Sequence, residues 1–224
     1  NKNFDIVWYR RPKAPILSSF LHENDKKNSL RENNIFFQNF WQIIARDAIW
    51  INYPDNARRA NCKMLQLKLA MQVGFKIPKT LFSNDPSRIK AFITGNLPEQ
   101  TIYKTFSPVV WYNPNIDLHL AYTSCITVSD LTSDAILQST AGIYQKKITK
   151  FFELRITYFG TYGVAVKLHS QEHPKGQIDW RAIPTEDLII ERYEIPPDLN
   201  EKCIALMREL GLLFGCFDLI VTPD

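Results

Sequence analysis

Two hydrophobic periods run through this chain, and together they predict a mixture of helices and strands. A period near 3.6 residues at 36–44, 57–73 and 199–210 predicts helices with one apolar face. The aromatic density of 36–44 favours a buried helix. The helix at 57–73 is expected to take Asn56 as its N-cap and to end at Gly74, because these residue types suit those positions.

Short apolar runs bounded by polar residues or prolines predict strands. They lie at 6–9, 50–54, 101–105, 121–128, 143–168 and 216–221, with a further extended segment at 77–81. The first and last of these runs are apolar enough to predict buried strands. Strands dominate the second half without a strict strand–helix alternation, so the pattern indicates an α+β fold.

The remaining segments are predicted to be short helices or loops. Two short helices follow capping residues, at 85–92 (Asp85 or Ser83) and 129–137 (Ser129). Two stretches that are polar or interrupted by proline, 106–118 and 171–183, are expected to be loops.

Composition places the chain among ordinary globular proteins. Its 224 residues are 45% hydrophobic and 22% charged, which is enough to bury a core in one large domain or two small ones. The net charge of +4 is too small to indicate a nucleic-acid partner. No apolar run is long enough for a bilayer and no signal peptide is visible, so we expect a cytoplasmic protein without a membrane partner. The chain opens at Asn1 rather than methionine, and its natural N-terminus is expected to lie upstream.

Cysteine, histidine and glycine patterns exclude several kinds of site. The four cysteines form no CxxC pair and the four histidines show no ligand spacing, which argues against structural zinc and a disulfide framework. The sequence contains neither GxxxxGK[ST] nor GxGxxG, which argues against a P-loop or a Rossmann site. A bound nucleotide would therefore be held by strand side chains and lysines.

The most informative segment is YQKKITKFFELR, residues 144–155. Strand alternation places Glu153 and Arg155 on one face, next to a turn that carries Lys146, Lys147 and Lys150. A carboxylate and a guanidinium beside a cationic turn suit a polyanion that carries hydroxyls, such as a nucleotide. The same residues also fit a surface hairpin with ion pairs.

Three other cations are candidates for phosphate binding, each with a simpler alternative. Lys104 lies within an apolar strand, where it would either bind phosphate or extend to the sheet edge. Lys63 lies in the first turns of a helix and equally fits a solvated face. Arg181 follows Asp179 and Trp180 in a polar loop, where it would form a surface turn or place a cation over a phosphoryl group.

Two strand residues complete the candidates. Lys167 alternates with apolar neighbours and shares a face with Ala165, so it would converge with Glu153 and Arg155 if the strands align. Asp218 lies inside the apolar run CFDLIV, where a carboxylate is costly unless it is paired or binds a cation. It would therefore be a magnesium ligand or the partner of a lysine.

The order of these motifs resembles the ATP-grasp superfamily. The series GFKIPKT, IYK, YQKKITKFFELR, VKLHSQ, DWR and LGLLFGCFDLI is most similar to RimK-like ligases that mature ribosomal peptides, the microviridin-type (graspetide) maturases. The resemblance covers residues 7–221 and implies a nucleotide held between two antiparallel-rich α+β subdomains. It divides the chain into a pre-ATP-grasp segment (1–55, incomplete at its start), an N-terminal subdomain (56–138) and a C-terminal subdomain (139–224, incomplete at its end).

The resemblance also implies a role for each candidate. Lys63 and Lys104 match phosphate-binding lysines, Glu153 the acid that binds ribose, and Asp218 the first Mg2+ carboxylate. The hinge strand, whose backbone meets adenine, corresponds to Gln145, Lys146, Lys147 and Ile148. The basic positions near the γ-phosphate and acyl phosphate are Arg155, Lys167 and Arg181.

Two departures from the family pattern stand out. The family's Glu-x-Asn strand would follow Asp224, so the remaining magnesium ligands are expected beyond this sequence. The stretch 106–118 has no glycine, so the glycine-rich lid of many ATP-grasp enzymes is not expected there.

The implied function is an ADP-forming ligase that uses ATP and Mg2+. It would activate side-chain carboxylates as acyl phosphates and form ester or amide crosslinks in a ribosomal precursor peptide with a leader segment. The basic residues Arg10, Arg11, Arg58 and Arg59 would dock an acidic peptide, and the apolar Phe36 and Trp41 leave a homodimer open. The alternatives are a RimK-like ligase for a small metabolite or a protein tail, and a nucleotide-binding module without turnover.

Overall fold

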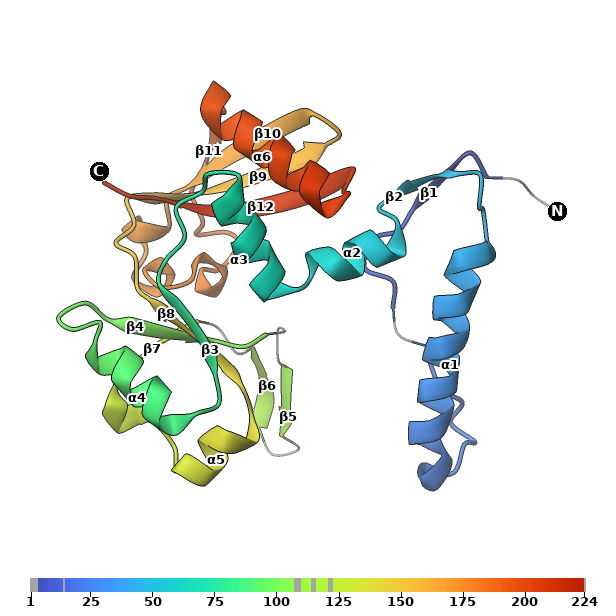
Figure 1. Cartoon of the computed structure of the whole chain (residues 1–224), viewed down its shortest axis with the longest axis horizontal. Helices are drawn as coiled ribbons and strands as arrows, with labels where there is room; N and C mark the ends of the chain where they lie inside the picture. Colours follow the sequence, from blue (N-terminus) through green and yellow to red (C-terminus); the bar gives the residue numbers. More distant parts are fainter. Residues whose placement is uncertain (1–3, 14, 107–109, 114–115, 121–122, 224) are drawn as a thin grey trace.

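Two four-stranded antiparallel sheets form the body of the protein (Figure 1). The computed structural model describes residues 4–13, 15–106, 110–113, 116–120 and 123–223. One sheet has the order β3 (Thr80–Ser83), β8 (Gly142–Lys146), β4 (Thr101–Lys104) and β7 (Ser124–Ile126). The other has the order β11 (Ile190–Tyr193), β10 (Tyr162–Leu168), β9 (Phe152–Phe159) and β12 (Phe214–Val221).

The first sheet and the helices α4 (Pro86–Thr94) and α5 (Asp134–Ser139) make up what we call the first lobe. Ile89 and Ile93 of α4 pack with Leu137 of α5 and Tyr144 of β8 in one buried cluster. The predicted cap of α4 is confirmed, since the Asp85 carboxylate accepts hydrogen bonds from the backbone N–H groups of Ser87 and Arg88. The short helix expected at 129–137 is instead a 3-10 turn, η1 (Val128–Asp130), followed by α5.

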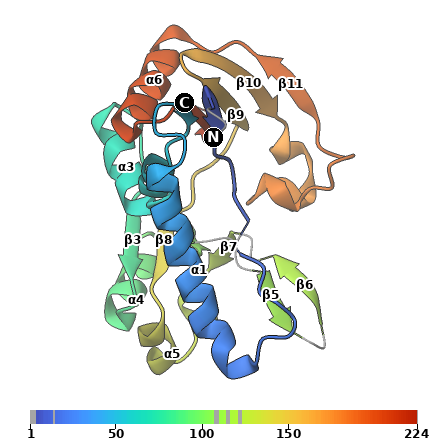
Figure 2. The ribbon, with the colours of Figure 1, turned by 90° about the vertical axis from the view of Figure 1, so that its right-hand side faces the viewer.

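The second sheet and the helices α3 (Lys63–Gln72) and α6 (Pro197–Leu210) make up the second lobe, the upper one in Figure 2. Leu154, Ile156 and Tyr158 of β9 pack against Cys203 and Met207 of α6. Apolar side chains of α3 pack against the same helix. The sheet therefore has one face on the helical core and another toward the first lobe.

The single helix predicted at 57–73 is two helices, α2 (Pro54–Ala60) and α3, separated at Asn61 and Cys62. Asn56 is not the N-cap, because α2 begins after Tyr53 and Asn56 lies inside it. The side-chain amide of Asn56 instead donates a 2.8 Å hydrogen bond to the Gly211 carbonyl at the end of α6. Gly211 ends α6 with φ +67° and Gly74 follows α3 with φ +92°, left-handed values that favour glycine.

The buried helix predicted at 36–44 is wrong in both length and environment. Helix α1 (Glu23–Ile43) begins after His22 and has no buried residue. Figure 1 shows it apart from the two sheets, joined to them through the parallel pair β1 (Ile6–Trp8) and β2 (Ile49–Ile51). The aromatic rings of α1 stack on each other, and Trp41 packs edge-on against Trp50.

Three further predictions need correction. The stretch 106–118 contains the hairpin of β5 (Val110–Asn113) and β6 (Ile116–Leu120), although 107–109 and 114–115 lie outside the described residues. The stretch 171–183 contains the 3-10 turns η2 (Ser170–Glu172), η3 (Pro174–Gly176) and η4 (Trp180–Ala182). Strand β1 is not buried, since Ile6 and Trp8 are 59% and 55% exposed.

Within the described ranges, no helix combines the length and hydrophobicity that a bilayer crossing requires.

Candidate functional site

A cavity of about 440 Å³ lies between the two lobes, and most of the predicted site residues line it. The first lobe contributes side chains of β4 and β8, the second lobe contributes side chains of β9 and β12, and the loop around Asp179 closes one side. The predicted residues on its wall are Lys63, Lys104, Gln145, Lys146, Lys147, Ile148, Glu153, Arg181 and Asp218. Arg155 and Lys167 are not among the lining residues.

Lys104 lies at the end of β4 within a group of cations. Its Nζ donates a 2.9 Å hydrogen bond to Gln145 Oε1. Burial lowers the pKa of Lys104, and the positive charges of Lys150, Arg181 and Lys63 lower it further, against the opposing effect of Asp179. A site that concentrates positive charge in this way suits an anion with several charges.

Gln145 holds Lys104 through its side chain. Its amide nitrogen donates to Thr80 Oγ1 over 2.8 Å, and that hydroxyl donates to the Pro78 carbonyl over 2.7 Å. Gln145 is 6% exposed, so both ends of its amide are used inside the protein. This network orients Lys104 before any ligand binds.

The hinge segment after Gln145 is hydrogen-bonded to the first lobe. The Lys146 N–H donates to the Lys79 carbonyl and the Lys147 N–H donates to the Gln100 carbonyl, over 2.9 and 2.8 Å. The lysine side chains lean the same way, with Nζ atoms 2.9 Å from Glu99 Oε1 and 2.7 Å from Gln100 Oε1 respectively. Ile148 follows them on the cavity wall.

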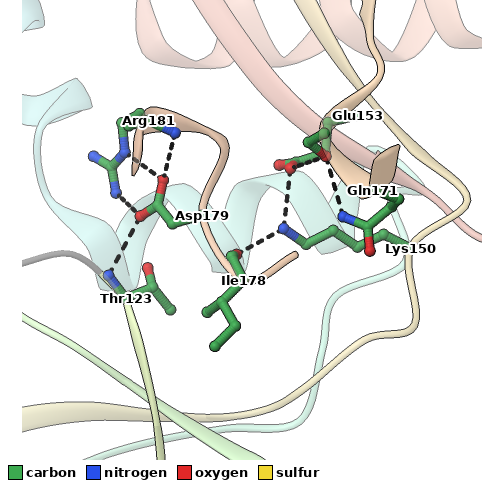
Figure 3. Close-up of polar contacts among 8 residues, drawn as sticks. Thr123, Lys150, Glu153, Gln171, Ile178, Asp179 and Arg181 are labelled. Atoms are coloured by element: carbon green, nitrogen blue, oxygen red, sulfur yellow. Dashed lines mark hydrogen bonds and ion pairs between the residues drawn. The ribbon is translucent and has the colours of Figure 1, made fainter. Parts of the chain in front are cut away.

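Glu153 forms a buried ion pair with Lys150 on the other side of the cavity (Figure 3). Its Oε1 accepts hydrogen bonds from Lys150 Nζ over 3.0 Å and from Ser170 Oγ over 2.8 Å. Lys150 also donates to the Ile178 carbonyl over 2.7 Å. Both side chains are almost buried, so the pair fixes the loop that begins at Gln177 against β9.

Asp179 and Arg181 form a second, separate pair in that loop (Figure 3). Asp179 Oδ1 accepts from Arg181 Nε over 2.8 Å, and Oδ2 accepts from Arg181 Nη2 and from the Thr123 N–H. Burial alone would raise the pKa of Asp179, but the hydrogen bonds and charge of Arg181 lower it to about 2. The carboxylate is therefore ionised at neutral pH.

The Asp218 environment differs from the prediction. Its side chain is 54% exposed, because β12 is an edge strand of the second sheet and Asp218 points away from α6. Its partner is Arg155 rather than a lysine, with Nη1 2.8 Å from Oδ1. Arg155 also lies over the Trp180 ring, 5.5 Å from its centroid. Among the described residues, no three His, Cys, Asp or Glu side chains form a group that could hold a metal ion.

Lys167 lies on the opposite face of the sheet from Glu153 and Arg155. In the ladder it is paired with Leu154, a core residue, so the two cations do not converge. Its Nζ lies 3.5 Å from Glu191 Oε2 and 4.9 Å from the Phe152 ring centroid. The predicted convergence of Lys167 with Arg155 is wrong, because the residue opposite Arg155 is Val166 and Lys167 is one position further along β10.

Lys150, Asp179 and Thr123 also line the cavity, although none of them was assigned a role of its own in the predicted site. Lys150 stands three residues before Glu153, and that spacing next to a predicted acid was an available signal. Asp179 and Thr123 are separated by 56 residues, and no local pattern links them.

Solved structures with the same architecture are ATP-grasp ligases. A RiPP-associated ATP-grasp ligase from Chryseobacterium gregarium, solved with ADP and a leader and core peptide, has 27% identity and a TM-score of 0.83, over 98% of this chain and 65% of that one. The macrocyclase MdnC from Microcystis aeruginosa MRC, bound with precursor peptide MdnA, has 28% identity and a TM-score of 0.84, over 98% and 66%. The macrocyclase MdnB from the same organism has 26% identity and a TM-score of 0.77, over 98% and 66%.

The chain spans less than two thirds of the length of these proteins. No protein-family model and no curated protein matches it. The α+β architecture and the predicted resemblance are nevertheless confirmed by the solved structures. The chain has the ATP-grasp fold, in the form shared by the RiPP-associated ATP-grasp ligases and macrocyclases.

Proposed function

We propose that this protein is an ATP-dependent, ADP-forming ligase that joins side-chain carboxylates to hydroxyls or amines in a ribosomal precursor peptide. The observation that supports this most directly is the cavity between the lobes, where Lys63, Lys104 and Arg181 meet beside Glu153. Two neighbours above 25% identity were solved with ADP or with a precursor peptide, which favours a peptide substrate with leader and core segments.

The nucleotide would lie along the cavity from the hinge to the loop around Asp179. We place adenine beside Ile148. The backbone N–H groups of Lys146 and Lys147 already donate to carbonyls of the first lobe, so Ile148 is the next hinge position that adenine can meet. We place the ribose hydroxyls at Glu153 and the phosphates at Lys63 and Lys104. Arg155 does not line the cavity, so it would act indirectly, through its contacts with Asp218 and Trp180. Lys167 has no part in this arrangement, since it lies on the far face of the sheet.

The reaction proceeds in two balanced steps. A carboxylate oxygen of the peptide attacks the γ-phosphorus of ATP, the bond to the β–γ bridging oxygen breaks, and ADP leaves. A hydroxyl or amine then attacks the acyl carbon and loses its proton, the carbon–oxygen bond to phosphate breaks, and inorganic phosphate leaves. The protein holds the groups in line and offsets the phosphate charge with its cations.

Among the described residues, Asp218 fits the role of one magnesium ligand. Magnesium in nucleotide sites is bound by one or two carboxylates, phosphate oxygens and water. Asp218 supplies an exposed carboxylate on the cavity wall, and it would exchange its contact with Arg155 for the ion. When bound, magnesium would offset charge on the transferring phosphoryl group.

The proposal includes the division of the chain into 1–55, 56–138 and 139–224 and a cytoplasmic location. The described cysteines are free, which agrees with a reducing compartment. This division along the sequence differs from the two lobes, because β8 follows residue 139 but joins the first sheet, and α3 precedes residue 139 but packs against α6.

The precursor peptide would dock on the second lobe and the N-terminal segment. Of the four arginines proposed for an acidic peptide, Arg58 pairs with Asp55 and Arg59 donates to the Glu209 carbonyl. Arg10 lies over the Phe214 ring. Arg10 and Arg11 form no ion pair with a described side chain, so we take them as the better candidates for an acidic peptide.

A titration of the full-length protein with ATP and Mg2+, followed by an ADP-release assay with and without precursor peptide, tests the function. We expect nucleotide binding and peptide-dependent ADP release. Binding without release would favour the nucleotide-binding module, and release with a small amine or a protein tail in place of the peptide would favour the RimK-like alternative. Lys104→Ala should abolish release, while Lys68→Ala, an exposed lysine on α3, should not.

A further inference from the structure

The loop between Gln177 and Ala182 is hydrogen-bonded both to the segment that links the two sheets and to the first lobe. Lys150, in the segment that links β8 to β9, donates to the Ile178 carbonyl over 2.7 Å. Asp179 accepts from the N–H of Thr123, which precedes β7 in the first lobe, over 3.3 Å. Figure 3 shows both contacts, with Thr123 bonded to Asp179 and Lys150 bonded to Ile178. The loop is therefore bonded to the first lobe at Thr123 and, through Lys150, to Glu153 of the second lobe.

The same Asp179 carboxylate fixes the Arg181 guanidinium. Arg181 donates from Nε and Nη2 to the two oxygens of Asp179, and its backbone N–H donates to Oδ1 over 3.2 Å. Two parallel hydrogen bonds set the plane of a guanidinium as well as its distance. The Asp179 side chain is 7% exposed, whereas Arg181 is 52% exposed, so the buried acid anchors an accessible cation.

A carboxylate in this position is electrostatically unfavourable for a site that binds phosphates. Its negative charge lies on the cavity wall and opposes the effect of the lysines on Lys104. Such a group lowers affinity for a polyanion unless its charge serves another contact. Within the described part of the chain, the hydrogen bonds of Asp179 go to Arg181, the loop cation, and to Thr123 of the opposite lobe.

We infer that Asp179 is a positioning residue that orients Arg181 toward the cavity and couples this orientation to the approach of the two lobes. The inference rests on the proposed function and adds to it a residue that acts through another. When the lobes separate, Thr123 withdraws from Asp179 and the loop loses one of its two anchors. When they approach, Arg181 is locked in place for phosphoryl transfer.

Asp179→Asn and Arg181→Lys test the orientation. Asparagine keeps the size of Asp179 but loses its charge, and lysine keeps the charge of Arg181 but loses its two-point geometry. We expect each variant to lower kcat for ADP release by roughly 10- to 100-fold, with a much smaller change in KM for ATP. The double variant should lose no more than Arg181→Lys alone, because the two residues act as one unit.

Amide hydrogen exchange at Thr123 tests the coupling in the absence of turnover. Exchange at this amide should be slower with a bound non-hydrolysable ATP analogue in the wild type, and faster in Asp179→Asn. Asp187→Asn, an exposed acid of the same region, should leave kcat and exchange at Thr123 unchanged.

Three results would overturn the inference: additive losses in the double variant, wild-type kcat in Arg181→Lys, or unchanged exchange at Thr123 in Asp179→Asn. A wild-type protein that neither binds ATP nor releases ADP would instead refute the proposed function. In that case slower exchange at Thr123 in the wild type than in Asp179→Asn would still support the contact between the lobes.

Discussion

Arg155 and Asp218 face each other across adjacent strands, with Nη1 of the arginine 2.8 Å from Oδ1 of the aspartate. Sequence reasoning gave them separate tasks, one as a cation near the phosphates and the other as a magnesium ligand. In the structure each is the partner of the other. Because both side chains are substantially exposed, the pair contributes at most about 1 kcal/mol to stability and is suited to rearrangement.

Asp218→Asn should therefore change the magnesium requirement more than the fold. We expect the Mg2+ concentration for half-maximal ADP release to rise by roughly 10-fold or more, since a ligand carboxylate is lost. The melting temperature should stay close to that of the wild type. Asp198→Asn, which is even more exposed, serves as the control. An unchanged magnesium dependence would remove Asp218 from the metal site.

Nucleotide affinity should fall as pH rises through the lowered pKa of Lys104. Burial favours the neutral amine, so the free protein loses this positive charge at a lower pH than an ordinary lysine would. Titrations with ATP between about pH 7 and about pH 10 measure the effect. Lys104→Arg should bind ATP with a flatter pH profile, because arginine stays charged throughout. A wild-type profile as flat as that of the arginine variant would contradict this prediction.

Acid should remove the stability that Asp179 contributes. Its pKa of about 2 lies below the ordinary value of 3.8, so the ionised form is favoured by folding and the contribution is complete above about pH 4. It is lost as the pH falls toward 2, and its size is about 2 kcal/mol. Urea unfolding should show Asp179→Asn less stable than the wild type at neutral pH, with the gap narrowing near pH 3. A gap that stays constant with pH would mean that charge is not the cause.

Lys63→Ala and Lys167→Ala should have opposite outcomes. Lys63 lines the cavity and its loss should weaken ATP binding by roughly 10-fold, as expected for one charged contact to phosphate. Lys167 lies on the far face beside Phe152, and its loss should leave ATP binding unchanged. Calorimetric titration of both variants makes the comparison. Equal losses would show that the sheet faces are wrongly assigned to the nucleotide.

The sequence was a good guide where local chemistry decides the structure. Asp85 caps α4 as expected, and glycines end α3 and α6 in the left-handed conformation. Alternation along β9 correctly separated Glu153 and Arg155 from the core residues between them. The cavity brings together most of the residues that the motif order indicated.

The failures share a physical cause, which is that a pattern shows an apolar face but not what covers it. Helix α1 has an aromatic face without a buried residue, and β12 is a strand with one open edge and one exposed face. The prediction that Lys167 shares a face with Arg155 was wrong for a related reason. The turn between β9 and β10 decides which residues of the two strands lie opposite each other. The Asp179 contact with Thr123 depends on how the lobes meet, and no local sequence rule predicts that.

The pairing of β8 with β3 and β4 places Gln145 opposite Thr80 and Ile102. If the register of β8 shifted by one residue, Tyr144, now in the core, would face Lys104, and Gln145 would face the apolar cluster. The register of β8 therefore matters for the cavity as well as for the packing of the core. Insertions or deletions within 142–146 should disable the site even in variants that still assemble the sheet.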